Sequence, residues 1–180
     1  RSKVWNSGGK INPWSGQSIT LGYQKALDEW LDKPAFQIDW FTGCCVLCPL
    51  NLLGDKDFFL PAYFAYNEDV EASLRLRDMG MNIWLEPRSL IFHVAGGWGR
   101  KRDKANEGNI LPILHYYNLR NRLWTLRLHN NFYHITAFVF QWAKIFAYSG
   151  YFLLSGKFIK LNMAMRALKD GMLKKLTNLH

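Results

Sequence analysis

Cysteine is scarce in this chain of 180 residues, and all of it lies at Cys44, Cys45 and Cys48. No distant cysteine could pair with any of these, which argues against a secreted domain built on disulfides. Zinc binding would need a second ligand pair at finger-like spacing, and the sequence has none. We therefore expect buried cysteines that act as small hydrophobic residues, with zinc thiolates as the less favoured alternative.

An initiator methionine is also missing, and no apolar signal segment follows the first three residues. We expect the chain to be a piece of a longer protein. Low hydrophobicity, the mark of a disordered chain, is absent too, since 49% of the residues are hydrophobic and 16% are aromatic. The length suits one cored domain.

Acidic residues are rare in the second half of the chain. Residues 99–180 carry 14 Lys or Arg and 3 Asp or Glu, whereas residues 1–98 carry 9 and 11. The net charge is therefore −2 in the first part and +11 in the second. This split predicts acidic site chemistry in the first part and a basic surface that meets an anionic partner, either nucleic acid or lipid, in the second.

Hydrophobic period and turn residues predict an α/β arrangement followed by helices. Residues 5–23 are typical of a hairpin or of a loop packed by aromatic residues. Residues 36–50 are typical of a strand buried on both faces, and 67–80 of a helix that ends at Gly80. Two short strands are expected at 81–85 and 90–94, a basic loop at 99–109, and helical segments at 111–128, 132–155 and 157–180.

Two residues are unusual in the apolar run 36–50. Asp39 places a carboxylate among hydrophobic residues, which is costly unless the charge is paired. Gly43 interrupts the run, and a glycine in a strand often marks the close approach of a ligand or of another backbone.

The strongest candidate site is the pair Glu68 and Asp69 at the expected helix start, with His93 at the end of a later strand. A helix N-terminus beside a strand C-terminus is a usual place for a site in α/β proteins. The alternative is that the two acids only favour the helix dipole and that His93 is a satisfied strand-end residue.

The order of motifs closely resembles the C-terminal half of inverting family 2 glycosyltransferases, above all rhamnosyltransferase-like and galactofuranosyltransferase-like members. The resemblance covers about residues 36–128. The residues that carry it are Asp39-Trp40-Phe41-Thr42-Gly43-Cys44-Cys45, Gly54 and Asp57, Tyr66-Asn67-Glu68-Asp69-Val70-Glu71, Leu74-Arg75-Leu76-Arg77, Gly80, Pro87, His93 and Tyr116-Tyr117-Asn118-Leu119-Arg120-Asn121-Arg122.

This resemblance implies the C-terminal portion of a GT-A fold, a nucleotide-diphospho-sugar donor, a glycan or lipid-linked glycan acceptor, and a divalent metal, Mg or Mn. Asp69 is then the general base on the acceptor hydroxyl, with Glu68 supporting it. His93 is a metal ligand. Gly43, Cys44 and Cys45 begin the acceptor platform, and Trp98 stacks on a sugar face. Asp39, Arg120 and Asn121 complete the expected set.

The family's nucleotide-binding half and its metal-binding Asp-x-Asp are missing from this chain. Asp55-Lys56-Asp57 is a literal Asp-x-Asp, but it follows the acceptor strand and is better explained as a surface turn. We therefore assign residues 1–110 to the acceptor-side half of a GT-A domain, and expect the isolated chain to bind nucleotide-sugars weakly and to be inactive.

Residues 111–180 are expected to form a helical, membrane-associating extension. Lys144 within the apolar stretch 132–155 argues for an amphipathic or bundled segment. The resemblance implies a cytoplasmic enzyme of cell-surface polysaccharide synthesis, peripheral to the inner face of the bacterial cell membrane. The alternative is a noncatalytic basic module that binds membranes or nucleic acid; a nucleic-acid partner is disfavoured because only Arg100-Lys101-Arg102 forms a tight basic run.

Overall fold

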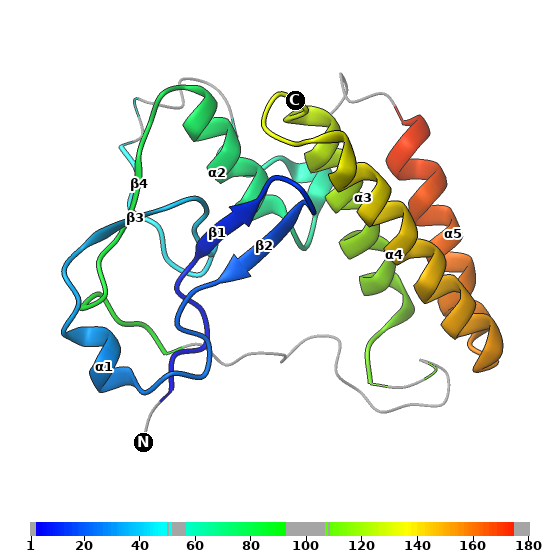
Figure 1. The fold of residues 1–180 in the computed structure, drawn as a ribbon, viewed down its shortest axis with the longest axis horizontal. Coiled ribbons are helices and arrows are strands. Elements are labelled where there is room, and N and C mark those ends of the chain that lie inside the picture. Colours follow the sequence, from blue (N-terminus) through cyan, green and yellow to red (C-terminus); the bar gives the residue numbers. More distant parts are fainter. Residues whose placement is uncertain (1–2, 50, 52–56, 93–106, 108, 175–180) are drawn as a thin grey trace. The chain divides into compact units, whose positions relative to one another are not determined.

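The structure is a computed structural model that describes residues 3–49, 51, 57–92, 107 and 109–174. These residues form two compact units made of interleaved segments. The first unit takes residues 1–12, 17–59 and 68–93, and the second takes 13–16, 60–67 and 94–180. Figure 1 shows small sheets and short helices in the first unit and three long helices in the second.

The first unit is a mixture of short strands and helices. Strands β1 (Gly9–Asn12) and β2 (Gln17–Thr20) pair as an antiparallel hairpin, one of the two forms expected for residues 5–23. Helix α1 (Leu27–Leu31) precedes β3 (Phe36–Ile38), which pairs antiparallel with β4 (Ile83–Leu85). Helix α2 (Glu68–Asp78) lies between these two strands in the chain and ends before Gly80, whose φ is 80°. The sequence predicted the helix and its end correctly.

The core of the first unit lies between β3, β4 and α2. Ile38, Ala72 and Leu76 are buried there against Ile83. Alternate residues of the short strands and one face of α2 supply this cluster, as the hydrophobic period requires. The core therefore holds the first turns of α2 against the segment that follows β3.

The long buried strand predicted over residues 36–50 is wrong beyond Ile38. Strand β4 supplies ladder partners only for Phe36 to Ile38. The next backbone groups bond elsewhere, because the Asp39 N–H donates to the Gly9 carbonyl oxygen (2.7 Å) and the Phe41 N–H donates to Ser73 Oγ (3.1 Å). Residues 43–47 are exposed in a turn and the coil after it, so the expectation of buried cysteines is wrong for Cys44 and Cys45, and Cys48 is only partly buried.

The second predicted strand, at 90–94, does not form over its described residues, since 90–92 are coil. Ser89 N–H donates to the Glu86 carbonyl oxygen, which closes a turn after β4. The remaining residues of that strand and most of the loop 99–109 lie outside the described part of the chain.

The second unit is a helical bundle. It contains the 3-10 helix η2 (Pro61–Tyr63) and three long helices, α3 (Pro112–Leu128), α4 (Ile135–Leu154) and α5 (Phe158–Leu173). Helix α5 packs against both α3 and α4 (Figure 1). The fully buried residues of this core include Leu123, Ile145, Ala164 and Ala167. The periodicity of residues 111–180 predicted all three long helices.

Two glycines in these helices provide a matched pair for a stability measurement. A Cβ at Gly171 would lie 2.7 and 3.0 Å from the buried side chain of Leu123, whereas a Cβ at Gly150 would meet nothing within 4 Å. We expect Gly171→Ala to lower the free energy of unfolding by about 1–3 kcal/mol through overpacking. Gly150→Ala should raise it by about 0.5–1 kcal/mol, because alanine has the higher helix propensity. Thermal unfolding of both variants checks this, and equal shifts would contradict the α3–α5 packing.

Candidate active site

The candidate active site lies in the first unit, at the first turn of α2. Glu68 and Asp69 are the first two residues of this helix, where the backbone dipole favours negative charge. Both residues are partly buried. The Val70 N–H donates to Asp69 Oδ1 at 2.8 Å. The pair therefore stands at a helix start, as the sequence predicted.

Burial raises the pKa of both acids above their usual range. Desolvation is the largest cause for Asp69, opposed by hydrogen bonds from the backbone N–H groups of Val70 and Gly43. Desolvation also raises the pKa of Glu68, and the neighbouring charge of Asp69 raises it further. Within the described part of the chain, Glu68 Oε2 is buried and has no hydrogen-bond partner. A buried carboxylate oxygen left without a partner is costly for folding, so a hydroxyl that reached it would relieve that cost.

The exposed turn after β3 lies against Asp69. The Gly43 backbone N–H bonds the Asp69 carboxylate, and a Cβ built on Gly43 would lie 3.9 Å from Asp69 Cβ. Cys44 and Cys45 continue this turn with exposed side chains. The structure thus brings together the acid pair and the residues expected to begin the acceptor platform.

Ser73 is a residue of this site that the sequence analysis missed. Its side chain is fully buried; Ser73 Oγ donates to the Asp69 carbonyl oxygen at 2.6 Å and accepts the Phe41 N–H. It therefore ties the first turn of α2 to the segment leading to Gly43. The available signal was its spacing, since Ser73 follows Asp69 by one helical turn.

Asp39 is paired, as its place in an apolar run required. Its Oδ2 accepts the Ile11 N–H at 2.9 Å, and its Oδ1 lies 3.5 Å from Lys10 Nζ and 3.6 Å from Arg77. These contacts join the β1 strand to the last turn of α2. They give Asp39 a structural role in this unit.

Arg120 and Asn121 act within the second unit, where they hold residues 60–67. Asn121 is fully buried, and its Nδ2 donates to the carbonyl oxygens of Tyr63, Ala65 and Tyr66 at 2.7–2.8 Å. Arg120 donates to the Ala62 carbonyl oxygen at 2.8 Å. In the chain, this loop leads directly to Glu68.

The held loop has an unusual backbone. Phe64, Tyr66 and Asn67 have φ values of 59°, 66° and 62°, in the left-handed region that side chains other than glycine rarely adopt. Asn67 directly precedes α2, although the residue before a helix normally has an extended backbone. Such conformations persist only where surrounding contacts impose them, and they concentrate at functional sites.

Arg120 is buried without a carboxylate at hydrogen-bond distance among the described residues. Its guanidinium instead lies over the ring of Trp124, 4.0 Å from the centroid, and 5.0 Å from each ring of Tyr116 and Tyr117. Tyr116 Oη donates to Asp170 Oδ2 at 2.6 Å. The Tyr-Tyr and Arg-Asn elements of the motif thus form one network that joins α3 to α5.

The expected metal centre cannot be assembled from the described residues. His93 and Trp98 lie outside them, as do Gly54 and Asp55. Within residues 3–49, 57–92 and 109–174, no three His, Cys, Asp or Glu side chains are grouped to hold a metal. The metal and its ligand His93 therefore stay predictions, and we derive no catalytic step through a metal.

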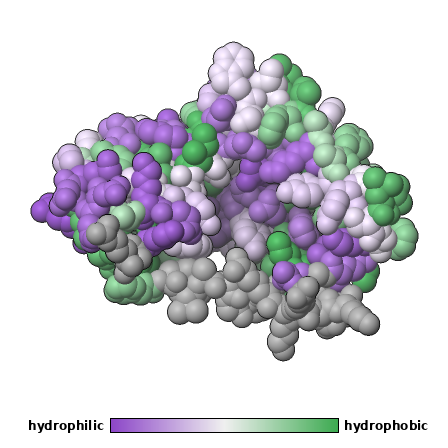
Figure 2. Space-filling model, turned by 60° about the horizontal axis from the view of Figure 1, so that its bottom comes forward, coloured by the Kyte–Doolittle hydropathy of each residue, from purple (hydrophilic) through white to green (hydrophobic). Residues whose placement is uncertain are grey.

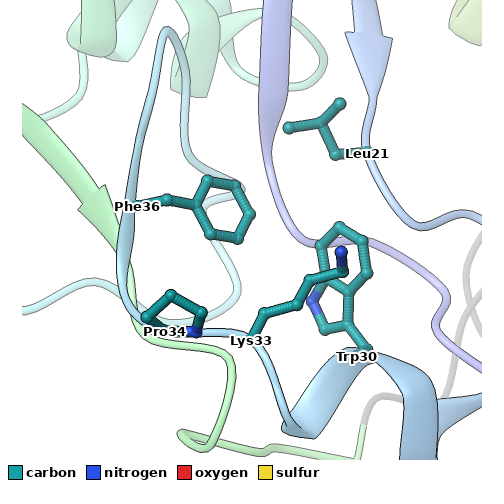
Figure 3. Close-up of a pocket in the computed structure, with 5 residues that line it drawn as sticks. All are labelled: Leu21, Trp30, Lys33, Pro34 and Phe36. Carbon is teal, nitrogen blue, oxygen red and sulfur yellow. The ribbon is translucent and has the colours of Figure 1, made fainter.

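A pocket of about 380 Å³ opens elsewhere in the first unit. Figure 3 shows its lining residues, Leu21, Trp30, Lys33, Pro34 and Phe36. The Lys33 ammonium lies 5.5 Å from the Trp30 ring centroid, and Trp30 meets Phe36 edge to face. Lys33 is the titratable residue of this lining and no carboxylate belongs to it, so we do not assign the chemistry to this pocket.

Comparison with curated proteins finds a partial relationship. The chain is 29% identical over 90 residues to the N-acetylglucosaminyl-diphospho-decaprenol L-rhamnosyltransferase of Mycobacterium tuberculosis, in two strains. The match covers 49% of this chain and 27% of the relative's length. No family model and no solved structure gives a significant match. The similarity supports a relationship to glycosyltransferases.

Proposed function

We propose that this chain is the acceptor-side part of an inverting glycosyltransferase of the GT-A type, with Asp69 as its general base. The observation that carries the proposal is the pair Glu68 and Asp69, whose carboxyls are held partly buried beside the exposed Gly43 turn. The partial similarity to a rhamnosyltransferase supports the same class of reaction. We propose a nucleotide-diphospho-sugar donor and a glycan or lipid-linked glycan acceptor.

In the proposed reaction, an acceptor hydroxyl approaches the Gly43 turn and hydrogen-bonds the Asp69 carboxylate. Its oxygen attacks the anomeric carbon of the donor sugar while its proton passes to Asp69. The bond from that carbon to the nucleoside diphosphate breaks with its electron pair, and the diphosphate leaves from the opposite face. A positioned carboxylate favours this step, because a neutral hydroxyl is a weak nucleophile.

The surroundings of Asp69 suit this role. Burial raises the carboxyl pKa, which makes the carboxylate a stronger base, while the N–H groups of Val70 and Gly43 keep the ionised form populated. Glu68 has an unpartnered buried oxygen, and a second acceptor hydroxyl that reached it would supply the missing hydrogen bond. The acid pair would thus divide base and orienting roles.

The full-length protein should transfer sugar from a nucleoside-diphosphate sugar to a polyprenyl-diphosphate N-acetylglucosamine acceptor, with inversion at the anomeric carbon. Donors with rhamnose and galactofuranose are tested first. Nuclear magnetic resonance of the product reports its anomeric configuration. Product that retains the donor configuration would contradict the single-displacement step, and absence of transfer with any sugar donor would contradict the proposal.

Gly43→Ala tests whether the acceptor approaches across this turn. The added Cβ would meet only ordinary contacts at 3.5–3.9 Å from Phe59 and Asp69, so the free energy of unfolding should stay within about 1 kcal/mol of the wild type. Transfer should fall by about tenfold, because the methyl group would occupy the space beside the base. Thermal unfolding and initial rates are compared, and unchanged transfer would place the acceptor elsewhere.

A further inference from the structure

Helix α4 turns its less apolar side toward the bundle. Its inward residues are exposed by 8% or less, and two of the five are polar. They are Ala137, Gln141, Ile145, Ser149 and Phe152. Gln141 Nε2 donates to the Ser15 carbonyl oxygen at 2.8 Å, so part of this inward side makes polar contacts.

The outward side of α4 carries a stripe of large hydrophobic side chains. Their spacing of four, three, four and seven residues places them on one line along the helix, and their exposed fractions run from 41% to 76%. They are Ile135, Val139, Trp142, Phe146 and Leu153. A helix at the surface of a globular protein normally presents the opposite pattern, with polar residues outward.

The apolar surface continues past the end of α4 into the first turn of α5. Leu154, Phe158 and Ile159 are 89%, 63% and 48% exposed. Figure 2 shows hydrophobic side chains, in green, at the molecular surface beside hydrophilic ones, in purple. We call these three residues and the α4 stripe together the outward face. An exposed apolar area of this kind, rimmed by polar groups, marks an interaction surface.

The net charge of residues 132–174, the segment that contains the outward face, indicates an anionic partner. Residues 132–174 carry six Lys or Arg and one Asp. The side chains of Arg166 and Lys174 are 59% and 53% exposed, and both pair with one acid, Asp170, at 3.8 and 3.4 Å, so this group keeps a positive charge. Lys157 Nζ lies 2.7 Å from Tyr151 Oη and 4.5 Å from the centroid of its ring, next to the apolar end of α4. Aromatic, aliphatic and cationic side chains in this combination are typical of helices that lie in a lipid headgroup layer.

None of the helices in the described part of the chain is long and apolar enough to cross a membrane. We propose that the outward face binds the surface of an anionic bilayer, with α4 lying along the headgroup layer and the basic groups near it meeting lipid phosphates. Because the outward face belongs to the bundle, failure of vesicle binding would leave the proposed transfer reaction untouched, and failure of transfer would leave vesicle binding untouched.

Vesicle flotation with the 180-residue chain tests this proposal. Phosphatidylcholine vesicles are compared with vesicles that contain about 30% phosphatidylglycerol, at low and at physiological salt. We expect the chain to float with the anionic vesicles, and added salt to weaken the binding. Absence of flotation with the anionic vesicles, or equal flotation with both, would overturn the proposal.

A matched pair of triple variants locates the binding surface. The outward variant replaces Val139, Trp142 and Phe146 by Gln, and should lower the apparent vesicle affinity by about tenfold or more. The control variant replaces Val46, Trp84 and Phe92 by Gln. These residues are of the same three types, are also exposed, and lie in the first unit, so the affinity should stay within about twofold. Equal loss in both variants would contradict the assignment to α4.

A charge variant keeps the test valid if the outward variant fails to fold. Arg166→Gln with Lys169→Gln should weaken binding to anionic vesicles several-fold while circular dichroism stays unchanged, because both side chains are exposed on α5. Sedimentation of the chain without lipid tests the alternative occupant. Dimerisation that the outward variant abolishes, in a chain that does not bind vesicles, would assign the face to a second copy instead.

Discussion

The Asp69→Asn variant is expected to unfold at a higher temperature than the wild-type chain and, in the full-length protein, to lose sugar transfer by about 100-fold or more. Asparagine keeps an oxygen that can accept the hydrogen bonds of the Val70 and Gly43 N–H groups, but it cannot take the proton of the acceptor hydroxyl. Donor binding should remain close to that of the wild type. The variant therefore separates proton transfer from binding.

The gain in stability follows from the direction of the pKa shift. Burial raises the pKa of the Asp69 carboxyl, so the folded chain holds this proton more tightly than the unfolded chain does. The stabilisation is complete below the unfolded-state pKa and is lost as pH rises through the folded-state pKa. At neutral pH the ionised carboxylate carries a desolvation cost, which the neutral amide removes.

Asp39→Asn is the matched control, because it makes the same substitution at a carboxylate that has cationic partners. It loses ion pairs with Lys10 and Arg77 and should lower the free energy of unfolding by about 1 kcal/mol. If Asp69→Asn lowers the unfolding temperature as Asp39→Asn does, Asp69 is a structural acid of the first helical turn. A higher unfolding temperature for Asp69→Asn together with a lower one for Asp39→Asn would support the assignment of Asp69 as the general base.

Asn121→Ala should be the most destabilising of the substitutions considered, at about 3 kcal/mol or more, because it removes hydrogen bonds to three loop carbonyl oxygens, of which that of Tyr63 keeps the Ala65 N–H. Alanine also leaves a cavity in a fully buried position. The left-handed backbone of Phe64, Tyr66 and Asn67 would lose the contacts that hold it.

Denaturant unfolding followed by circular dichroism measures this loss, with Asn130→Ala as its control. Asn130 is exposed in the turn after α3, and its replacement should change the free energy of unfolding by less than about 0.5 kcal/mol. Because Asn67 is bonded directly to Glu68, we also expect transfer by the full-length Asn121→Ala protein to fall. Equal stability of the two variants would contradict the role of Asn121 in holding the loop.

The sequence predicted the elements whose pattern is local and periodic. The acids, helical spacing and Gly80 defined α2, and the apolar period of residues 111–173 defined the three long helices. The prediction of a strand over residues 36–50 failed because it rested on composition alone. The composition resembles that of a buried strand, but the length of the strand depends on how many residues of β4 pair with it. The number of paired residues is set by the tertiary fold, so the local sequence of residues 36–50 does not reveal it.

In the candidate site, too, the sequence revealed the residues that have a local pattern and missed those whose role depends on the tertiary fold. Glu68, Asp69 and Gly43 were identified from the sequence, and the structure places the Gly43 turn against Asp69. Ser73 was missed because a buried serine on a helix has no distinctive pattern until its two hydrogen-bond partners are known. The motif containing Arg120 and Asn121 could be recognised, but its physical role required the carbonyl groups of residues 62–66, which lie far away in sequence.

The most direct test of the central claim is the initial rate of sugar transfer by the full-length protein and by its Asp69→Asn variant, at equal folded concentration and saturating donor. If Asp69 is the general base, the variant should be slower by about 100-fold or more while its unfolding temperature is higher than that of the wild type. A folded variant that transfers sugar within a few-fold of the wild-type rate would show that another group removes the acceptor proton.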